Sequence, residues 1–144
     1  MASCGGNNVG YLDTAYDEFL NAGPRGVAAT GNRLPFAPRW NYTSSIDWEV
    51  PLGVPGTVHA GGDVQYSTIA FSDVLNTRQA AIPDQTIIDA HASYTTEDGR
   101  WTGLFTVRNM LDRRFNQIGS YVPPVEYFLE NPPRTVLFTL RYSL

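Results

Sequence analysis

The sequence predicts an all-β fold, an antiparallel up-and-down sheet that supplies about six strands of a larger transmembrane β-barrel. Three observations support it: apolar and polar residues alternate, short and long connections alternate, and aromatic residues recur at one end of the strands. The clearest strand is the last, where one face carries Val136, Phe138, Leu140, Tyr142 and Leu144. Because successive side chains of a strand point to opposite sides, this segment has one apolar and one polar wall.

Six segments carry the period-two pattern, and no helical pattern competes with them. They span residues 9–20, 40–52, 56–71, 86–96, 100–111 and 134–144. The connections 51–56 and 97–99 are short, whereas 21–39, 72–85 and 112–133 are long. All tight turns therefore fall at one end of the sheet, as in outer-membrane barrels with short periplasmic turns and longer outside loops. We expect residues 1–8 to be a disordered start and residues 9–144 to form the barrel portion.

Aromatic residues lie near the tight-turn end of four strands, each on the apolar parity of its own strand. The set expected to face lipid is Trp48, Tyr94, Trp101, Phe138, Leu140 and Tyr142. A belt of rings at one level is typical of a membrane–water interface, so the polar parity is expected to line the lumen. Core aromatics at one end of a soluble sheet would give the same pattern. The first strand has apolar residues on both parities, and its facing is left open.

Composition excludes several classes of function. The 144 residues carry a formal charge of −4, and the ten basic residues are all arginine without a basic run, which argues against nucleic-acid binding. Cys4 is the single cysteine, so no disulfide framework exists. No window approaches the roughly 20 apolar residues of a membrane helix.

Four titratable residues on the polar parity, His59, Asp63, Asp89 and His91, raise the question of a metal site. Pairing of 56–71 with 86–96 is expected to place position 66 opposite His91, which would leave His59 far along the sheet. We therefore expect no metal and no cofactor. Ser93 and His91 lie on one face without a nucleophile elbow around them, so no enzyme activity is expected.

Three separated motifs occur in a characteristic order: Gly31–Trp40 (GNRLPFAPRW), Arg108–Phe115 (RNMLDRRF) and Pro132–Thr135 (PPRT). With Val9–Asp13 before them and a strand at the end of the chain, they resemble the C-terminal part of TonB-dependent outer-membrane receptors over residues 9–144. The positions that carry the family pattern are Asn109, Asp112, Pro132, Pro133 and Arg134. The family usually ends in an aromatic residue, where this chain has Leu144.

The resemblance implies a 22-stranded barrel of which this chain is the final quarter, with the N-terminal plug absent and Met1 an internal or mis-called start. Physics agrees, because six strands are fewer than the roughly eight that close a membrane barrel, and open edges are costly in hydrocarbon. It further implies that Phe138, Leu140, Tyr142 and Leu144 are a signal for the barrel-assembly machinery. The expected location is the outer membrane of a Gram-negative bacterium, in contact with the lipid bilayer and lipopolysaccharide.

By the same resemblance, the whole receptor imports a scarce solute, such as an iron-siderophore, cobalamin or an oligosaccharide, with energy delivered through TonB. Loop residues that could contact this small molecule are Arg33, Trp40, Tyr121 and Tyr127, although for any one of them a solvated loop residue is the better interpretation. The alternative function is a soluble or periplasmic β-barrel that binds a small ligand.

Overall fold

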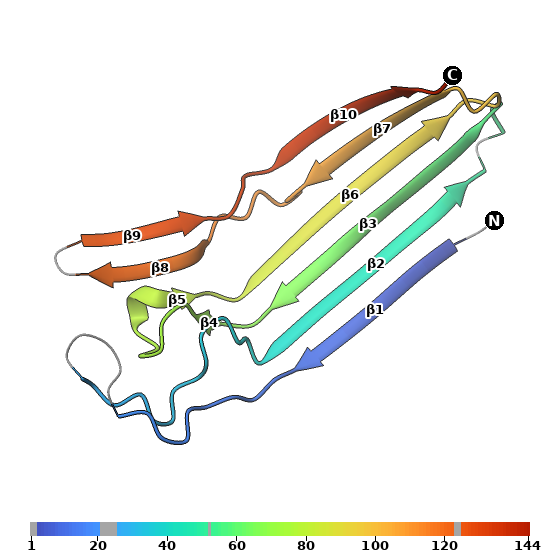
Figure 1. Ribbon diagram of the computed structural model, residues 1–144. Coiled ribbons are helices and arrows are strands. Elements are labelled where there is room, and N and C mark those ends of the chain that lie inside the picture. The colour runs from blue at the N-terminus through green and yellow to red at the C-terminus, as the bar shows by residue number, and fades with distance from the viewer. Residues whose placement is uncertain (1–2, 21–25, 52, 123–124) are drawn as a thin grey trace.

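The computed structural model describes residues 3–20, 26–51, 53–122 and 125–144, and it contains one long sheet (Figure 1). The sheet has six antiparallel strands in the order β1 (Ser3–Tyr11), β2 (Trp40–Val50), β3 (Thr57–Ser67), β6 (Gln85–Thr95), β7 (Trp101–Arg108) and β10 (Thr135–Tyr142). Each long strand lies beside the next long strand of the chain. This order confirms the predicted all-β, up-and-down arrangement.

Smaller elements lie within the long connections. β4 (Ala70–Phe71) pairs with β5 (Ala81–Ile82), and β8 (Asn116–Val122) pairs with β9 (Val125–Glu130). A single turn of 3-10 helix, η1 (Arg78–Ala80), precedes β5. No helix in the described ranges is long and apolar enough to cross a membrane. The sequence pattern did not predict these short elements. It also extended the third strand to residue 71, whereas β3 ends at Ser67.

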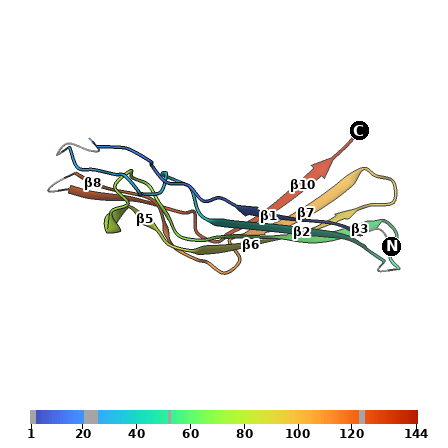
Figure 2. The same ribbon diagram turned by 90° about the horizontal axis from the view of Figure 1, so that it is seen from below.

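The long sheet is a single layer, and no other described strand or helix packs over either of its faces (Figure 2). The buried apolar residues of the described chain are Ala29, Ala37, Ala70, Ala80 and Ile82, which lie in the loops and in β4, η1 and β5. Phe138 and Leu140, by contrast, are 67% and 59% exposed. Within the described residues, the six long strands therefore contribute no buried apolar side chain.

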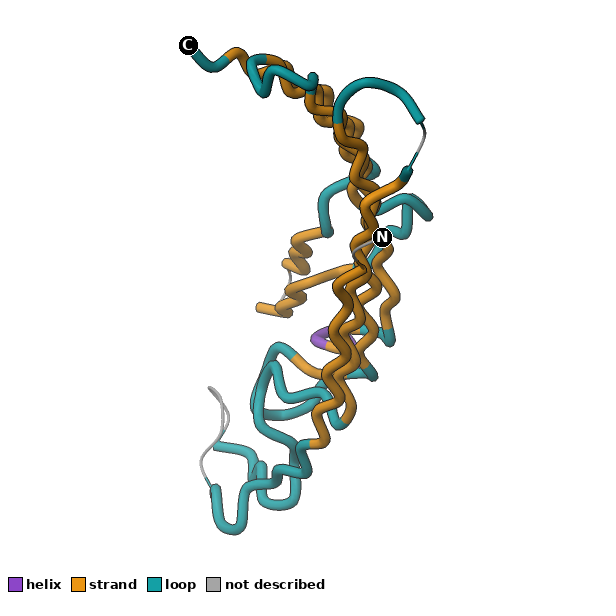
Figure 3. Tube along the Cα trace, turned by 90° about the vertical axis from the view of Figure 1, so that its right-hand side faces the viewer, coloured by secondary structure: helices purple, strands orange, loops and turns teal. Residues whose placement is uncertain are grey.

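The connections segregate by length, as the sequence predicts. The turns between β2 and β3 and between β6 and β7 lie at one end of the sheet, together with the start of β1 and the end of β10, and the long loops lie at the other (Figures 1 and 3). The β6–β7 turn is closed by Asp98, whose Oδ1 accepts from the Thr96 hydroxyl at 2.6 Å and the Arg100 amide at 3.1 Å. Gly99 follows with φ 70°, a backbone conformation that glycine adopts without strain.

The first strand corrects two expectations. Residues 1–8 were expected to be disordered and 9–20 to be a strand, but β1 spans Ser3–Tyr11 and pairs with β2 along its whole length. Residues 12–20 lie outside the strands, and residues 1 and 2 lie outside the described residues. Residues 5–8 are glycine and asparagine, which have low strand propensity, so pairing with β2 decides their conformation. A Cβ at Gly5 would come within 3.1 Å of the Ser45 carbonyl oxygen.

Candidate functional site

One face of the long sheet is apolar from β2 to β10. Successive partners across the strands are Trp48, Ala60, Ala92, Phe105 and Phe138, which we call the phenylalanine row. Two residues nearer the tight turns, the next row is Val50, Val58, Tyr94, Gly103 and Leu140. Residues paired in register, and residues two apart in a strand, share a face. The apolar parity of the sequence thus becomes one continuous surface.

The four aromatic residues expected at one level lie on a diagonal across this surface. Trp48 is in the phenylalanine row, Tyr94 is two residues nearer the turns, and Trp101 and Tyr142 are four residues nearer. With about 3.3 Å per residue and about 4.8 Å between strands, the diagonal makes an angle of roughly 35–40° with the rows. Strands of membrane barrels tilt by about 35–45° from the bilayer normal, and a tilt of this size would bring the diagonal line parallel to the membrane plane.

A second aromatic group lies at the loop end of the same face, and the sequence analysis missed it. Trp40 pairs with Tyr11, their ring centroids 4.6 Å apart, and Tyr42 pairs with Tyr66. Trp40 and Trp48 are eight residues apart, about 26 Å along the strand or roughly 20 Å along the normal of a barrel tilted by about 40°. The sequence of β2 contains the pattern that indicates this group, because Trp40, Tyr42 and Trp48 share one parity. Trp40, also named among the expected ligand contacts, is the first residue of β2, as the predicted span 40–52 has it.

The opposite face is polar, and it contains a contact that spans three strands. His91 Nε2 on β6 lies 2.8 Å from Asp47 Oδ1 on β2, across Gly61 of β3. The expected register was wrong: Gly61 pairs with His91, whereas Tyr66 pairs with Thr86. Loop 68–84 returns the chain so that Ser67 meets Gln85, a closure that residue patterns do not encode.

His59 consequently pairs with Ser93, which is two residues from His91 along β6. The expectation that His59 lies far along the sheet from His91 was therefore wrong. Asp63 pairs with Asp89, and Asp89 Oδ1 accepts from the Asn109 amide at 2.8 Å. Even so, no three His, Cys, Asp or Glu side chains of the described residues are grouped as metal ligands.

Two motifs whose contacting residues are 22 and 23 positions apart in sequence meet where β7 ends and β10 begins. The Asn109 side chain, 5% exposed, donates to the carbonyl oxygens of Arg113 at 2.9 Å and Pro132 at 3.0 Å. Asp112 Oδ1 accepts from the Arg134 amide at 2.8 Å, and this hydrogen bond lowers the pKa of the Asp112 carboxyl, with help from the guanidinium groups of Arg114 and Arg134. Asn109 and Asp112 both have positive φ, which asparagine and aspartate tolerate.

The loops at the far end are tied to one another. The Arg33 backbone exchanges two hydrogen bonds with the Asn76 side chain, at 2.7 and 3.0 Å. The Ser72 hydroxyl donates to the Gly119 carbonyl oxygen at 2.5 Å. Of the expected ligand contacts, Arg33 lies in this loop cluster, Tyr127 is exposed on β9, and the side chain of Tyr121 on β8 lies outside the described residues. Of the described side chains, Arg33 lies in the connection between β1 and β2, whereas Tyr127 lies on β9, in the connection between β7 and β10.

The sequence model of the family described as "TonB dependent receptor-like, beta-barrel" matches residues 3–110, which is more than half of the chain. The chain belongs to this family. The match ends before Asp112, Pro132, Pro133 and Arg134, so those motif positions remain a prediction from sequence. A search of the curated proteins found no match.

Three solved structures of uptake and siderophore receptors share the fold of this chain. The siderophore receptor PiuA from Acinetobacter baumannii matches 97% of this chain with a TM-score of 0.79 and 21% identity. The ferric yersiniabactin uptake receptor FyuA from Yersinia pestis matches 79% with a TM-score of 0.72 and 24% identity. BauA, the ferric preacinetobactin receptor from Acinetobacter baumannii, matches 79% with a TM-score of 0.64 and 17% identity.

The chain spans only 16–19% of the length of these three structures. The similarity therefore concerns one sector of a TonB-dependent receptor barrel. Within that sector, this chain supplies an apolar face bounded by two aromatic groups, a polar face, and a cluster of interconnected loops.

Proposed function

We propose that this chain is a sector of the outer-membrane barrel wall of a TonB-dependent receptor that imports a ferric siderophore. The observation that carries the proposal is the apolar face, exposed from β2 to β10 and bounded by aromatic residues at both ends. Its estimated height of roughly 20 Å is close to the apolar band of about 25 Å that outer-membrane barrels present to lipid. Trp48, Tyr94, Trp101 and Tyr142 then form the periplasmic belt.

The polar face supports the same orientation. A barrel that presents its apolar parity to lipid has a polar interior, and the contact between His91 and Asp47 lies on that interior face. The outer edges of β1 and β10 need further strands, because unpaired backbone groups cost several kcal/mol each in hydrocarbon. Additional wall of the receptor would pair with both edges.

The soluble-barrel alternative has less support. A soluble carrier of this kind encloses its apolar face and fills it with packed side chains. Here Val136, Phe138 and Leu140 on β10 are all more than half exposed. No described strand or helix covers either face of the sheet.

Siderophore is the proposed substrate class, ahead of cobalamin and oligosaccharides, because PiuA is described as a siderophore receptor and FyuA and BauA as receptors for ferric ligands. The loop cluster at the outer end would contact the ligand, with Arg33 and Tyr127 as the candidate contacts on this chain. Energy would come from TonB through the receptor's plug. The other proposed partners are lipopolysaccharide and the barrel-assembly machinery, which would recognise Phe138, Leu140, Tyr142 and Leu144.

Uptake by intact cells tests this function. Cells that lack the receptor and cells that carry it would be compared for uptake of ⁵⁵Fe bound to siderophores of several chemical classes, with labelled cobalamin and maltodextrin in parallel. We expect receptor-dependent iron uptake that stops when the proton gradient is collapsed. Receptor-dependent uptake of cobalamin or maltodextrin alone would replace the substrate class and leave the wall assignment intact.

A further inference from the structure

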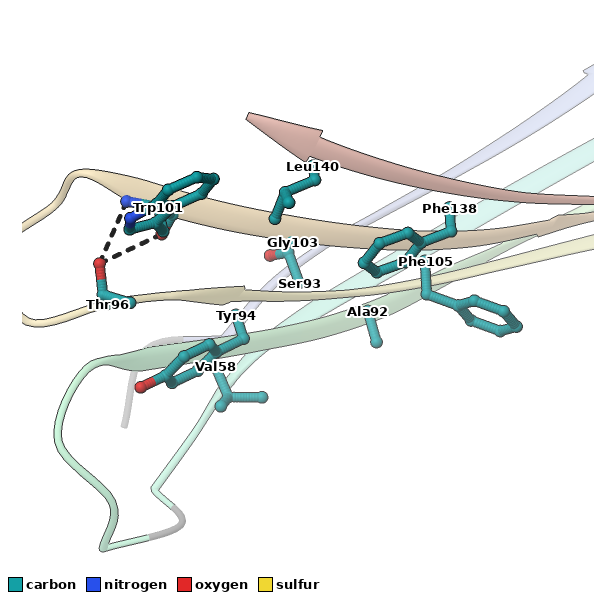
Figure 4. Close-up of a pocket in the computed structure, with 10 residues that line it drawn as sticks. All are labelled: Val58, Ala92, Ser93, Tyr94, Thr96, Trp101, Gly103, Phe105, Phe138 and Leu140. Carbon is teal, nitrogen blue, oxygen red and sulfur yellow. Dashed lines mark hydrogen bonds between the residues drawn. The ribbon is translucent and has the colours of Figure 1, made fainter. Parts of the chain in front are cut away.

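The apolar face is interrupted by a groove at its tight-turn end (Figure 4). The groove has a volume of about 510 Å³, and its floor is Gly103, which lies between Tyr94 on β6 and Leu140 on β10. The two flanking strands are two strand spacings apart, about 10 Å. A Cβ at Gly103 would meet the Phe138 ring at 3.7 Å, so the missing side chain leaves a depression that this ring borders. Phe105 and Phe138 line the inner end.

The walls of the groove are held in place. The Tyr94 hydroxyl donates to the Pro55 carbonyl oxygen at 2.6 Å, which fixes that ring against the β2–β3 turn. Trp101 packs on Tyr142 with ring centroids 4.7 Å apart. The Trp101 backbone amide donates to the Thr96 hydroxyl at 3.1 Å (Figure 4). These contacts hold the Tyr94 and Trp101 side chains that border the groove.

The groove is directed along the expected bilayer normal. Its path runs from the gap between Tyr94 and Trp101, over Gly103, toward Phe138. With about 3.3 Å per residue and about 4.8 Å between strands, this path is close to perpendicular to the diagonal line of aromatic residues. If that line marks the membrane interface, an acyl chain in the groove would have the orientation of its neighbours in the leaflet.

A polar depression adjoins the groove at the end nearest the tight turns. It shares Tyr94, Thr96 and Trp101 with the groove, and it adds Glu97 and Asp98. The hydroxyl of Thr96 and the Arg100 amide donate to Asp98 and lower the pKa of its carboxyl, so this residue is ionised at neutral pH. Arg100 lies beside it, with its Nε 3.9 Å from Asp98 Oδ2.

We propose that the groove and the depression together bind one phospholipid with a primary-amine head group, of the phosphatidylethanolamine class. One acyl chain lies over Gly103, the ammonium group lies at Glu97 and Asp98, and the phosphate lies toward Arg100. Two acidic side chains beside one basic side chain complement this zwitterion and disfavour an anionic head group. The inference rests on the proposed function, because it requires the apolar face to contact lipid.

Native mass spectrometry of the complete receptor tests the site. The detergent-solubilised receptor would be mixed with equimolar phosphatidylethanolamine, phosphatidylcholine and phosphatidylglycerol that carry identical acyl chains. We expect retention of phosphatidylethanolamine about tenfold above phosphatidylglycerol, the size of one charge-assisted hydrogen bond. Phosphatidylcholine should be retained less than phosphatidylethanolamine, because its methylated ammonium donates no hydrogen bond.

Two pairs of variants separate the acyl and head-group parts. Gly103→Leu fills the groove and should remove the preferential binding, whereas Ala60→Leu adds the same bulk to the apolar face outside the groove and should preserve it. Glu97→Gln combined with Asp98→Asn should equalise the three lipids, since the introduced amide retains an oxygen for the turn hydrogen bonds. Glu49→Gln, on the polar face near the same end, is the charge control.

The outcomes distinguish this site from the wall assignment. Equal retention of the three lipids by the unaltered receptor, or an unchanged preference in Gly103→Leu, would overturn the site and leave the wall assignment standing. Failure of the receptor to retain any phospholipid would instead contradict the assignment of the apolar face to lipid.

Discussion

His91 and Asp47 are in contact across a strand that separates theirs, with 2.8 Å between Nε2 and Oδ1. Gly61, the residue between them in the register, makes the contact possible. A Cβ there would collide with the Asp47 carboxylate, approach the Ile46 carbonyl oxygen to 2.7 Å and approach the His91 ring to 2.8 Å. The contact between Asp47 and His91 on the polar face therefore requires a residue without a Cβ at position 61.

Gly61→Ala should destabilise the sheet by about 1–3 kcal/mol, since it overpacks a site where one obstacle is backbone. Gly103→Ala is the matched control, because its Cβ would meet only the Phe138 ring at 3.7 Å, an ordinary contact. We expect the control to change stability by less than about 0.5 kcal/mol. Urea unfolding of the receptor in phospholipid vesicles measures both. Equal effects would show that the contact across Gly61 imposes no constraint.

Phe138→Arg should lower the free energy of unfolding by about 2–4 kcal/mol, the cost of arginine near the bilayer midplane. Phe138 lies four residues from Tyr142, or roughly 10 Å from the periplasmic belt along the normal of a tilted barrel. The neighbouring Thr139→Arg should have little effect, because that position lies on the polar face. The same vesicle unfolding assay compares the pair, and similar losses would contradict the facing of both residues.

Asp112→Asn should weaken the junction between β7 and β10 in a pH-dependent way. The lowered pKa means that the native state favours the ionised carboxyl, so its contribution is present above the ordinary value of 3.8 and is lost as pH falls through the lowered pKa. Hydrogen-exchange protection of the Arg134 amide should fall in that acidic range in the unaltered receptor. In Asp112→Asn, protection should already be reduced at pH 7 and should vary little on acidification.

Asn109→Ala should destabilise the base of the β8–β9 hairpin by about 2–4 kcal/mol, because it removes three hydrogen bonds and the residue's tolerance of positive φ. Asn131→Ala is a close control: its side chain also contacts Arg113 and Pro132, but its φ is not positive. The control should cost about 1–2 kcal/mol less. Hydrogen exchange at Phe115 and Asn131 would report the local loss.

Trp40→Ala should affect stability and leave ligand binding intact. Removal of its ring eliminates the contact with Tyr11 at the loop end of the apolar face, for an expected loss of about 1–2 kcal/mol. Siderophore affinity, measured by equilibrium binding to purified receptor, should change by less than about twofold. A loss of affinity without a loss of stability would restore Trp40 to the ligand contacts.

The sequence alone determined the strands whose residues alternate strongly, the segregation of short and long connections, and the apolar parity of Trp48 and Phe138. These features depend on neighbouring residues, because the two-residue period and the turn preference of Glu97–Gly99 are local properties. The motifs around Asn109 and Pro132 were also visible, although their hydrogen bonds were not.

Only the tertiary structure decided how the strands align. β1 forms from glycine and asparagine because β2 offers it a hydrogen-bonding edge, and the register of His91 depends on how loop 68–84 closes. The diagonal line from Trp48 to Trp101, the second aromatic group around Trp40, and the groove over Gly103 all follow from pairing between segments distant in the chain. Such pairing is non-local, so no single strand's pattern contains it.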